Sequence, residues 1–170
     1  MACRACTTAP VIDRRYSGES LCQRHFVSAV EKSVQRELRQ QAVALEASGE
    51  PLQRIAVALS GGKDSTVALH LVQAWAAQRR LELVALAIDE GIAGYRAPAL
   101  ECARRGCDTL GVELRVSSYR DLVGMGLDEL LQAQPPAGSP CSPCGILRRR
   151  ALNFAAREAG VDALVLGHNL

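Results

Sequence analysis

The residues best suited to chemistry form one hexapeptide: Ser60, Gly61, Gly62, Lys63, Asp64 and Ser65. An apolar run precedes it and a segment with helical apolar spacing follows it, which predicts a strand, a glycine turn and a helix. Two adjacent glycines let the backbone turn sharply and approach a ligand closely. The start of the helix adds unpaired N–H groups and the positive end of a dipole. The hexapeptide therefore predicts a phosphate-binding loop.

The spacing differs from that of the common P-loop, in which four residues separate the first glycine from the Gly-Lys pair. The alternative is a plain glycine turn with an incidental lysine. Only two lysines, Lys32 and Lys63, stand among the 20 Lys and Arg residues of the chain. In so arginine-rich a chain, a lysine at the centre of the loop indicates that a compact point charge is required there.

Two close ligand pairs at the N-terminus predict a metal site. Cys3-x-x-Cys6 is followed, after fifteen residues, by Cys22-x-x-His25. Each pair can clamp one edge of a tetrahedral zinc site, and the insert can loop back between them around a turn at 15–18. A segment this short has little core, so the metal would supply its folding energy. Four ligands leave no open position, so we expect a structural zinc; the alternative is four unrelated reduced side chains.

A second cysteine pair, Cys141-x-x-Cys144, lies in a stretch rich in proline and glycine, which predicts a loop over 134–145. Three arginines follow at 148–150. Positive charge and a helix N-terminus favour the reactive thiolate. The possible roles are metal or iron–sulfur ligation, persulfide formation and a redox disulfide, against two idle loop cysteines. Cys102 and Cys107 are five apart on a predicted helix, and we expect both to pack in the core.

The remaining pattern is that of an α/β protein. A helical stripe over 26–47 links the metal module to the rest of the chain. Apolar strands at 55–59, 83–88, 112–117 and 163–166 then alternate with helices at 64–78, 97–109, 119–133 and 145–159. This alternation predicts a doubly wound parallel sheet covered on both faces. The expected organisation is a zinc module (1–25), a linking helix (26–50) and an ATP-binding domain (51–170).

Ligands of such sheets bind beyond the carboxyl ends of the strands. The glycine loop, Asp89-Glu90-Gly91 and Gly167-His168-Asn169 all follow predicted strands. This shared placement predicts that they contribute to one site.

The chain of 170 residues is 48% hydrophobic, which suffices for one core plus a small appendage. Its net charge of +2 says little about nucleic acid. The N-terminus does not resemble a signal peptide, and no run approaches the roughly 20 apolar residues of a spanning helix. We therefore expect a cytosolic protein without membrane contact, in which seven cysteines indicate metal or redox chemistry.

Together these motifs resemble those of the tRNA thiolation enzymes, a group that comprises TtcA, TtuA and the wobble-uridine thiolases of archaea and eukaryotes. The matching motifs are the two N-terminal pairs, the Ser60–Ser65 loop, the run DEGIAGYR at 89–96, Cys141-x-x-Cys144-Gly145 and Gly167-His168-Asn169. The loop alone is also similar to that of GMP synthetases and other AMP-forming enzymes. TtcA-like enzymes lack the N-terminal module, and TtuA-like enzymes carry a lysine where Arg148 stands, so the wobble-uridine group fits best.

The resemblance implies an adenine-nucleotide alpha-hydrolase-like fold with a PP-loop. It also implies that the chain corresponds to the N-terminal portion of such an enzyme. Family members continue past Leu170 with a third cluster cysteine and a further strand, so the chain looks truncated.

The implied reaction is ATP-dependent adenylation of uridine C2, followed by replacement of the oxygen by sulfur. The implied catalytic residues are Lys63, Asp64, Cys141, Cys144 and Arg148. ATP would contact Ser60, Gly61, Gly62, Lys63, Asp64, Ser65, Asp89, Gly167 and His168. The implied cofactors are Mg²⁺, Zn²⁺ on Cys3, Cys6, Cys22 and His25, and a 4Fe–4S cluster on Cys141 and Cys144. The implied partners are tRNA, a sulfur donor such as a thiocarboxylated ubiquitin-like protein, and a second copy or paralogous subunit.

Three alternatives stay open at this point. The same chemistry could act on the T-loop 5-methyluridine. The chain could be a non-catalytic tRNA-binding fragment. It could also be another AMP-forming PP-loop synthetase, although that function leaves Cys141 and Cys144 without a role.

Overall fold

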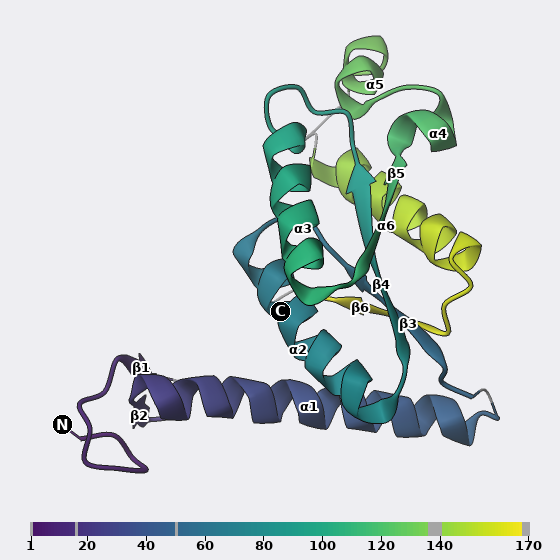
Figure 1. The fold of residues 1–170 in the computed structure, drawn as a ribbon. Coiled ribbons are helices and arrows are strands. Elements are labelled where there is room, and N and C mark those ends of the chain that lie inside the picture. The colour runs from purple at the N-terminus through teal and green to yellow at the C-terminus, as the bar shows by residue number, and fades with distance from the viewer. Residues whose placement is uncertain (1, 16, 50, 136–140, 168–170) are drawn as a thin grey trace. The chain divides into compact units, whose positions relative to one another are not determined.

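The structure is a computed structural model that describes residues 2–15, 17–49, 51–135 and 141–167, with the main chain alone at 141–143. The chain divides into two units, Met1–Gly49 and Glu50–Leu170. Both appear in Figure 1, and each is described by itself.

The first unit joins a small hairpin to a long helix. Strands β1 (Ile12–Arg14) and β2 (Glu19–Leu21) pair antiparallel, and helix α1 runs over Gln23–Ala47. The hairpin closes as expected, because the N–H groups of Ser17 and Gly18 both donate to the Arg14 carbonyl. The two short strands carry no sequence signal strong enough to predict them. The helix starts earlier than expected, so His25 lies in its first turn. Cys3, Leu21 and Cys22 form the small buried cluster of this unit.

The second unit is built on a four-stranded parallel sheet, which confirms the predicted fold class. Its strands are β3 (Arg54–Ala58), β4 (Glu82–Asp89), β5 (Glu113–Ser118) and β6 (Ala163–Leu166). Their order in the sheet is β5-β4-β3-β6. Val57 is paired with Ala85 on one side and with Val165 on the other. The chain thus reverses its direction of travel across the sheet beside β3, which is where open α/β sheets form a ligand crevice.

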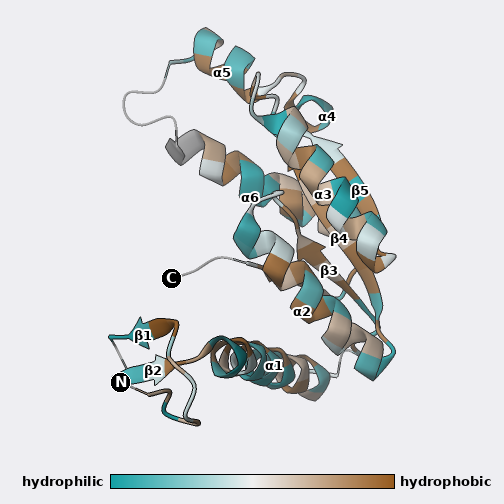
Figure 2. Cartoon of the chain, turned by 60° about the vertical axis from the view of Figure 1, so that its left-hand side comes forward, coloured by the Kyte–Doolittle hydropathy of each residue, from teal (hydrophilic) through white to brown (hydrophobic). Residues whose placement is uncertain are grey.

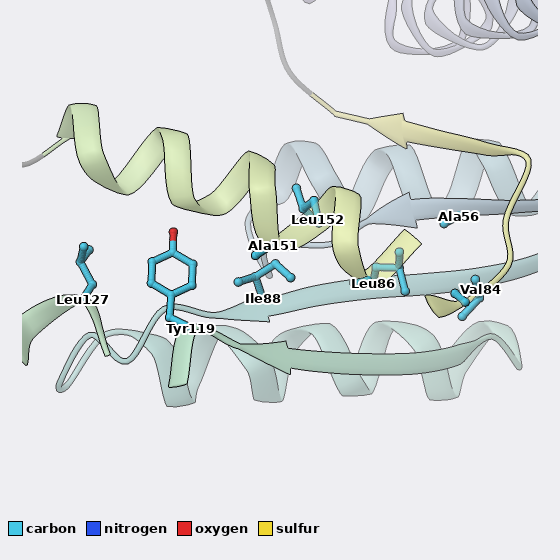
Figure 3. Packing of buried hydrophobic residues seen from close by; sticks show 10 residues of the cluster. Ala56, Val84, Leu86, Ile88, Tyr119, Leu127, Ala151 and Leu152 are labelled. Carbon is cyan, nitrogen blue, oxygen red and sulfur yellow. The ribbon is translucent and has the colours of Figure 1, made fainter. Parts of the chain in front are cut away.

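Helices cover both faces of this sheet (Figure 1). Helices α2 (Lys63–Arg79) and α3 (Arg96–Leu110) pack on one face through a cluster that includes Val57, Leu69 and Cys107. Helix α6 (Cys141–Glu158) packs on the other face. Figure 3 shows Ala151 and Leu152 of α6 lying over Leu86 and Ile88 of β4. The central strands β3 and β4 are predominantly hydrophobic in Figure 2, as expected for strands buried on both faces.

The prediction of a single helix at 119–133 is wrong, because the chain forms two helices there. Helix α4 (Tyr119–Val123) ends at Gly124, whose φ is +81°, and α5 (Leu127–Ala133) begins after Gly126. A left-handed backbone at Gly124 ends a helix. The glycine at 126 also permits close approach to Gly91, since an added Cβ on Gly126 would lie 3.3 Å from the Gly91 Cα.

The prediction of a loop over 134–145 is also wrong for the last part of that range. Helix α6 already begins at Cys141, so Cys144 and Gly145 lie in helical structure. Pro143 is tolerated there because the first N–H groups of a helix have no partner within it. Residues 136–140 of this stretch fall outside the described residues.

The two cysteines of α3 differ in their exposure to solvent. Cys107 is buried as expected, whereas Cys102 is exposed and accepts a hydrogen bond from Arg105. Two residues that do not share a helix face cannot both point into the same core. No helix among the described residues is both long enough and apolar enough to cross a membrane.

Candidate functional site

The glycine loop joins the end of β3 to the start of α2, as the sequence predicted. Gly62 precedes the first helical residue, Lys63. The side chains of Ser60 and Ser65 hold the turn, with their Oγ atoms 3.0 Å apart and the Ser65 hydroxyl donating to the Gly62 carbonyl. The loop therefore presents the start of a long helix at the carboxyl edge of the sheet, where an anion is stabilised.

Gly61 is required by the shape of this loop. Its φ is +83°, and an added Cβ would lie 2.0 Å from the main-chain oxygen of Ala99 in α3. No side chain fits there without displacing the backbone. The glycine thus lets the loop pack directly on the neighbouring helix.

Lys63 and Asp64 lie at the surface of the loop and pair with each other. The Lys63 Nζ is 3.0 Å and 3.1 Å from the two Asp64 carboxylate oxygens. The Lys63 side chain is 87% exposed, so its ammonium is accessible to a ligand. An arriving phosphate would compete with Asp64 for this charge.

A cavity of about 240 Å³ opens beside the loop, between the ends of β3 and β4 and helix α6. Its floor is apolar, with Leu86, Ile88 and Leu152. The residues of its polar rim are Ser60, Gly62, Asp64, Ser65, Glu90, Arg96, Arg148 and Gly167. The structure therefore brings most of the predicted nucleotide-contacting residues to one hollow.

Three of the described residues that were predicted to bind ATP do not line this cavity: Gly61, Lys63 and Asp89. Asp89 lines a neighbouring polar hollow beside Gly126 and Asp128, and its Oδ1 accepts a hydrogen bond from the Gly91 N–H. His168 lies outside the described residues. Gly167 packs close to α2, since an added Cβ would lie 3.2 Å from the Ala68 Cβ.

The charged centre of the cavity is Glu90, a residue that the sequence placed at this site without assigning it a role. This carboxylate is buried and lies between Arg96 and Arg148, with one oxygen 2.8 Å from the Nε of each. The sequence predicted that Asp89-Glu90-Gly91 contributes to this site, but it did not predict the arginines that Glu90 contacts. No periodicity marks such residues, because the contact between Glu90 and Arg148 spans 58 positions of the chain.

Arg148 connects the cavity to the second cysteine pair. Its Nη2 lies 3.6 Å from the Cys144 Sγ. The Tyr119 hydroxyl donates to the main-chain oxygen of Cys144 at 2.9 Å. Burial, together with the nearby Cys144, raises the pKa of Tyr119, so the phenol stays a donor at neutral pH. Cys141 starts the same helix, and its side chain lies outside the described atoms.

The N-terminal residues converge as a tetrahedral metal site requires. The ligand atoms of Cys3, Cys6, Cys22 and His25 all lie within 4.8 Å of one another. The Sγ atoms of Cys6 and Cys22 are 3.7 Å apart. Tetrahedral Zn–S bonds of about 2.3 Å place two sulfurs about 3.8 Å apart. Main-chain hydrogen bonding from Cys22 lowers the pKa of Cys3 to about 6, which favours the thiolate that binds metal.

The iron–sulfur group implied by the resemblance fits this chain in part. Cys141 and Cys144 stand one turn apart at the start of α6. Such clusters are bound by cysteine thiolates, commonly four. These two residues can therefore supply two ligands, and any others must come from elsewhere.

Known proteins show the same architecture. A family model described as a PP-loop domain matches residues 30–170. The tRNA 2-thiolation protein NcsA of Haloferax volcanii is 37% identical over 172 residues, which cover 100% of this chain and 54% of that protein. Cytoplasmic tRNA 2-thiolation protein 1 of Drosophila melanogaster is 37% identical over 166 residues, covering 96% of this chain and 47% of that protein.

Two solved structures have a similar fold. The U34-tRNA thiolase NcsA from Methanococcus maripaludis, solved with its [4Fe-4S] cluster, matches with a TM-score of 0.81 and 31% identity, covering 99% of this chain and 53% of that chain. An NH3-dependent NAD synthetase from Campylobacter jejuni matches with a TM-score of 0.55 and 18% identity, covering 82% of this chain and 57% of that chain, and shows the fold alone.

The chain spans about half the length of the curated relatives it matches. The family model, however, covers most of the chain, including the glycine loop and α6. The chain therefore belongs to the PP-loop domain family, and its homologues include the tRNA 2-thiolation proteins.

Proposed function

We propose that this chain is the ATP-activating part of a tRNA 2-thiouridine synthase that acts on the wobble uridine. The observation that carries the proposal is one cavity lined both by the glycine loop and by Arg148, which contacts Cys144. An anion site and a sulfur-bearing residue are thereby linked through one side chain. The wobble position is favoured because the similar enzyme of known structure is a U34-tRNA thiolase.

The first step is adenylation. The C2 oxygen of uridine attacks the α-phosphate of ATP, and pyrophosphate leaves. Lys63 and the N–H groups at the start of α2 stabilise the charge that develops on the phosphates. Asp64 is the loop carboxylate that could hold Mg²⁺, which when bound would supply positive charge to the pyrophosphate. The uridine oxygen becomes part of a good leaving group.

The second step is substitution. A sulfur nucleophile attacks C2, and AMP leaves with the former uridine oxygen. A 4Fe–4S cluster held by Cys141 and Cys144, when bound, would supply the sulfide. Arg148 keeps a positive charge beside Cys144. Burial alone would lower the pKa of its guanidinium, but the charges of Glu90, Cys144 and Tyr119 and the hydrogen bond to Glu90 together outweigh burial and raise that pKa.

The outer face of α6 is suited to nucleic acid. Arg149, Arg150, Phe154 and Arg157 are exposed on this helix. Arginines hold phosphates without reading sequence, and an aromatic ring can stack on a base. We propose that this face contacts tRNA, and that zinc holds the N-terminal module through Cys3, Cys6, Cys22 and His25.

The sulfur donor and the partner subunit stay predictions from the resemblance. A cytoplasmic location is proposed from the name of the Drosophila relative.

The adenylation step is tested with α-labelled ATP and tRNA in the full-length protein. Lys63→Ala should reduce AMP formation by about 100-fold or more, because the ammonium that stabilises the transferring phosphate is lost. Lys32→Ala, at the exposed lysine of α1, is the matched control and should leave the rate unchanged. Normal AMP release by the Lys63 variant would refute the assignment of the loop.

A further inference from the structure

Glu90 connects the nucleotide loop to the cysteine-bearing helix. Its side chain is 4% exposed, and its two oxygens are divided between two arginines from different helices. Arg96 starts α3, and Arg148 stands in α6. A buried carboxylate is costly unless it is paired, so its position depends on both partners.

Arg96 carries the connection to the loop. Its Nε lies 2.8 Å from the Glu90 Oε2, while its Nη1 donates to the Ser60 carbonyl at 2.9 Å. The contact between Nε and Oε2 is an ion pair without hydrogen-bond alignment, so neither buried atom has a hydrogen-bond partner among the described residues. The planar guanidinium of an arginine presents its donors in a rigid fork, whereas the ammonium of a lysine is a compact point charge without that fixed geometry.

Arg148 carries the connection to the cysteine. Its Nε donates to the Glu90 Oε1 at 2.8 Å, and its Nη2 lies 3.6 Å from the Cys144 sulfur. The contacts therefore run without a gap from the Ser60 main chain to Cys144. Both arginines also line the cavity, together with two carboxylates, Glu90 and Asp64, of which Asp64 is paired with Lys63. A phosphate placed there would draw on the guanidinium groups that Glu90 holds.

Glu90 itself is fixed by its backbone. Its carbonyl accepts a hydrogen bond from the Leu127 N–H at 2.7 Å. The next residue, Gly91, lies against Gly126. A carboxylate on such a rigid base can transmit a displacement of one arginine to the other.

We propose that Glu90 is a positioning residue that couples nucleotide binding at the loop to the placement of Cys144 on α6. The proposal rests on the proposed nucleotide site. Coupling between two sites is reciprocal and typically changes an affinity about 5- to 150-fold. Occupation of the loop should thus restrain the start of α6, and the loss of Glu90 should remove that restraint.

The test is hydrogen–deuterium exchange on the full-length protein with a non-hydrolysable ATP analogue and Mg²⁺. In the wild type, saturating nucleotide should slow amide exchange about fivefold or more both in the start of α2 and in residues 145–152 of α6. In Glu90→Gln, the α2 amides should still be protected by nucleotide, but the α6 amides should exchange as in the free protein. Arg96→Lys, which keeps the charge but loses the fork, should give the same result.

Glu113→Gln is the matched control, since Glu113 is also an arginine-paired carboxylate but lies at the start of β5. It should behave as the wild type. Should Glu90→Gln not fold, the Glu90→Gln/Arg96→Gln double variant removes both buried charges and should show the same uncoupling. Nucleotide protection of α6 that persists in these variants would overturn the proposal. Wild-type protection confined to α2 would also overturn it, whereas protection nowhere would overturn the nucleotide site itself.

Discussion

Gly61 shows how single atoms decide whether the nucleotide loop can form. Its left-handed φ leaves little freedom for another residue type, and a Cβ at this position would lie only 2.0 Å from the Ala99 oxygen. The sequence predicted a sharp glycine turn here, because two adjacent glycines between a strand and a helix let the backbone turn sharply. It could not predict the contact with Ala99, which depends on how α3 packs.

Gly61→Ala should therefore destabilise the loop and abolish nucleotide binding. A left-handed conformation costs a residue with a Cβ about 1–2 kcal/mol, and the clash with Ala99 adds to this cost. Gly111→Ala is the control, since Gly111 also has a positive φ but has nothing near its added Cβ. In urea unfolding, Gly111→Ala should show only the small loss of stability that the positive φ causes. In a nucleotide titration, Gly111→Ala should bind as the wild type does. Wild-type affinity in Gly61→Ala would contradict this account of the loop.

The cysteines of α3 permit a pH-based test. Burial raises the pKa of Cys107 to about 11, and the charge of Asp108 adds to the shift. At this pKa, only about one Cys107 thiol in a thousand is ionised near pH 8. The Cys102 thiol, by contrast, is exposed to the reagent. Iodoacetamide should label Cys102 and leave Cys107 unmodified until urea is added, as peptide mass spectrometry would show. Equal labelling rates in the folded protein would contradict the burial of Cys107.

The same pKa makes stability depend on pH at the alkaline end. Because the folded state holds the Cys107 proton more tightly than the unfolded chain, its contribution to stability is complete below about pH 9 and is lost as the pH rises toward 11.

At the scale of elements, the strands were the most predictable part. β3 and β4 are apolar runs bounded by polar residues, which is what a strand buried on both faces requires. The break between α4 and α5 and the early start of α6 were missed. Both depend on glycine or proline residues whose effect is decided by tertiary contacts, such as that of Gly126 with Gly91. The roles of Glu90 and Arg96 were missed for the same reason, because only the fold places Glu90 between Arg96 and Arg148.

The N-terminal element should depend on the zinc that we propose for Cys3, Cys6, Cys22 and His25. Its buried cluster has only Cys3, Leu21 and Cys22 as fully buried members, so ligand loss should unfold the β1–β2 hairpin. Cys22→Ser should lose zinc, measured by elemental analysis, and trypsin should cut faster at Arg14. Cys102→Ser removes an exposed thiol of α3 and should change neither property. Full zinc content in Cys22→Ser would show that the four side chains are not one site.

At the scale of the whole chain, the second unit combines a helix start suited to an anion, a cavity and a cysteine-bearing helix on one carboxyl edge of a parallel sheet. The sequence predicted this shared edge, because successive βα connections of a parallel sheet reach the same end of the strands. It could not predict that Arg96, Glu90 and Arg148 would meet in the cavity. The proposed reaction uses that meeting, with adenylation at the loop and substitution near Cys144.

The most direct test of this reaction is nucleoside mass spectrometry of tRNA from cells that lack the gene. The account predicts that 2-thiouridine is lost from the wobble position, and that it returns when the wild-type gene or its Lys32→Ala variant is restored but not with the Lys63→Ala variant. Unchanged wobble thiolation in the deleted strain, or a loss confined to the T-loop thio-nucleoside, would contradict the proposed function.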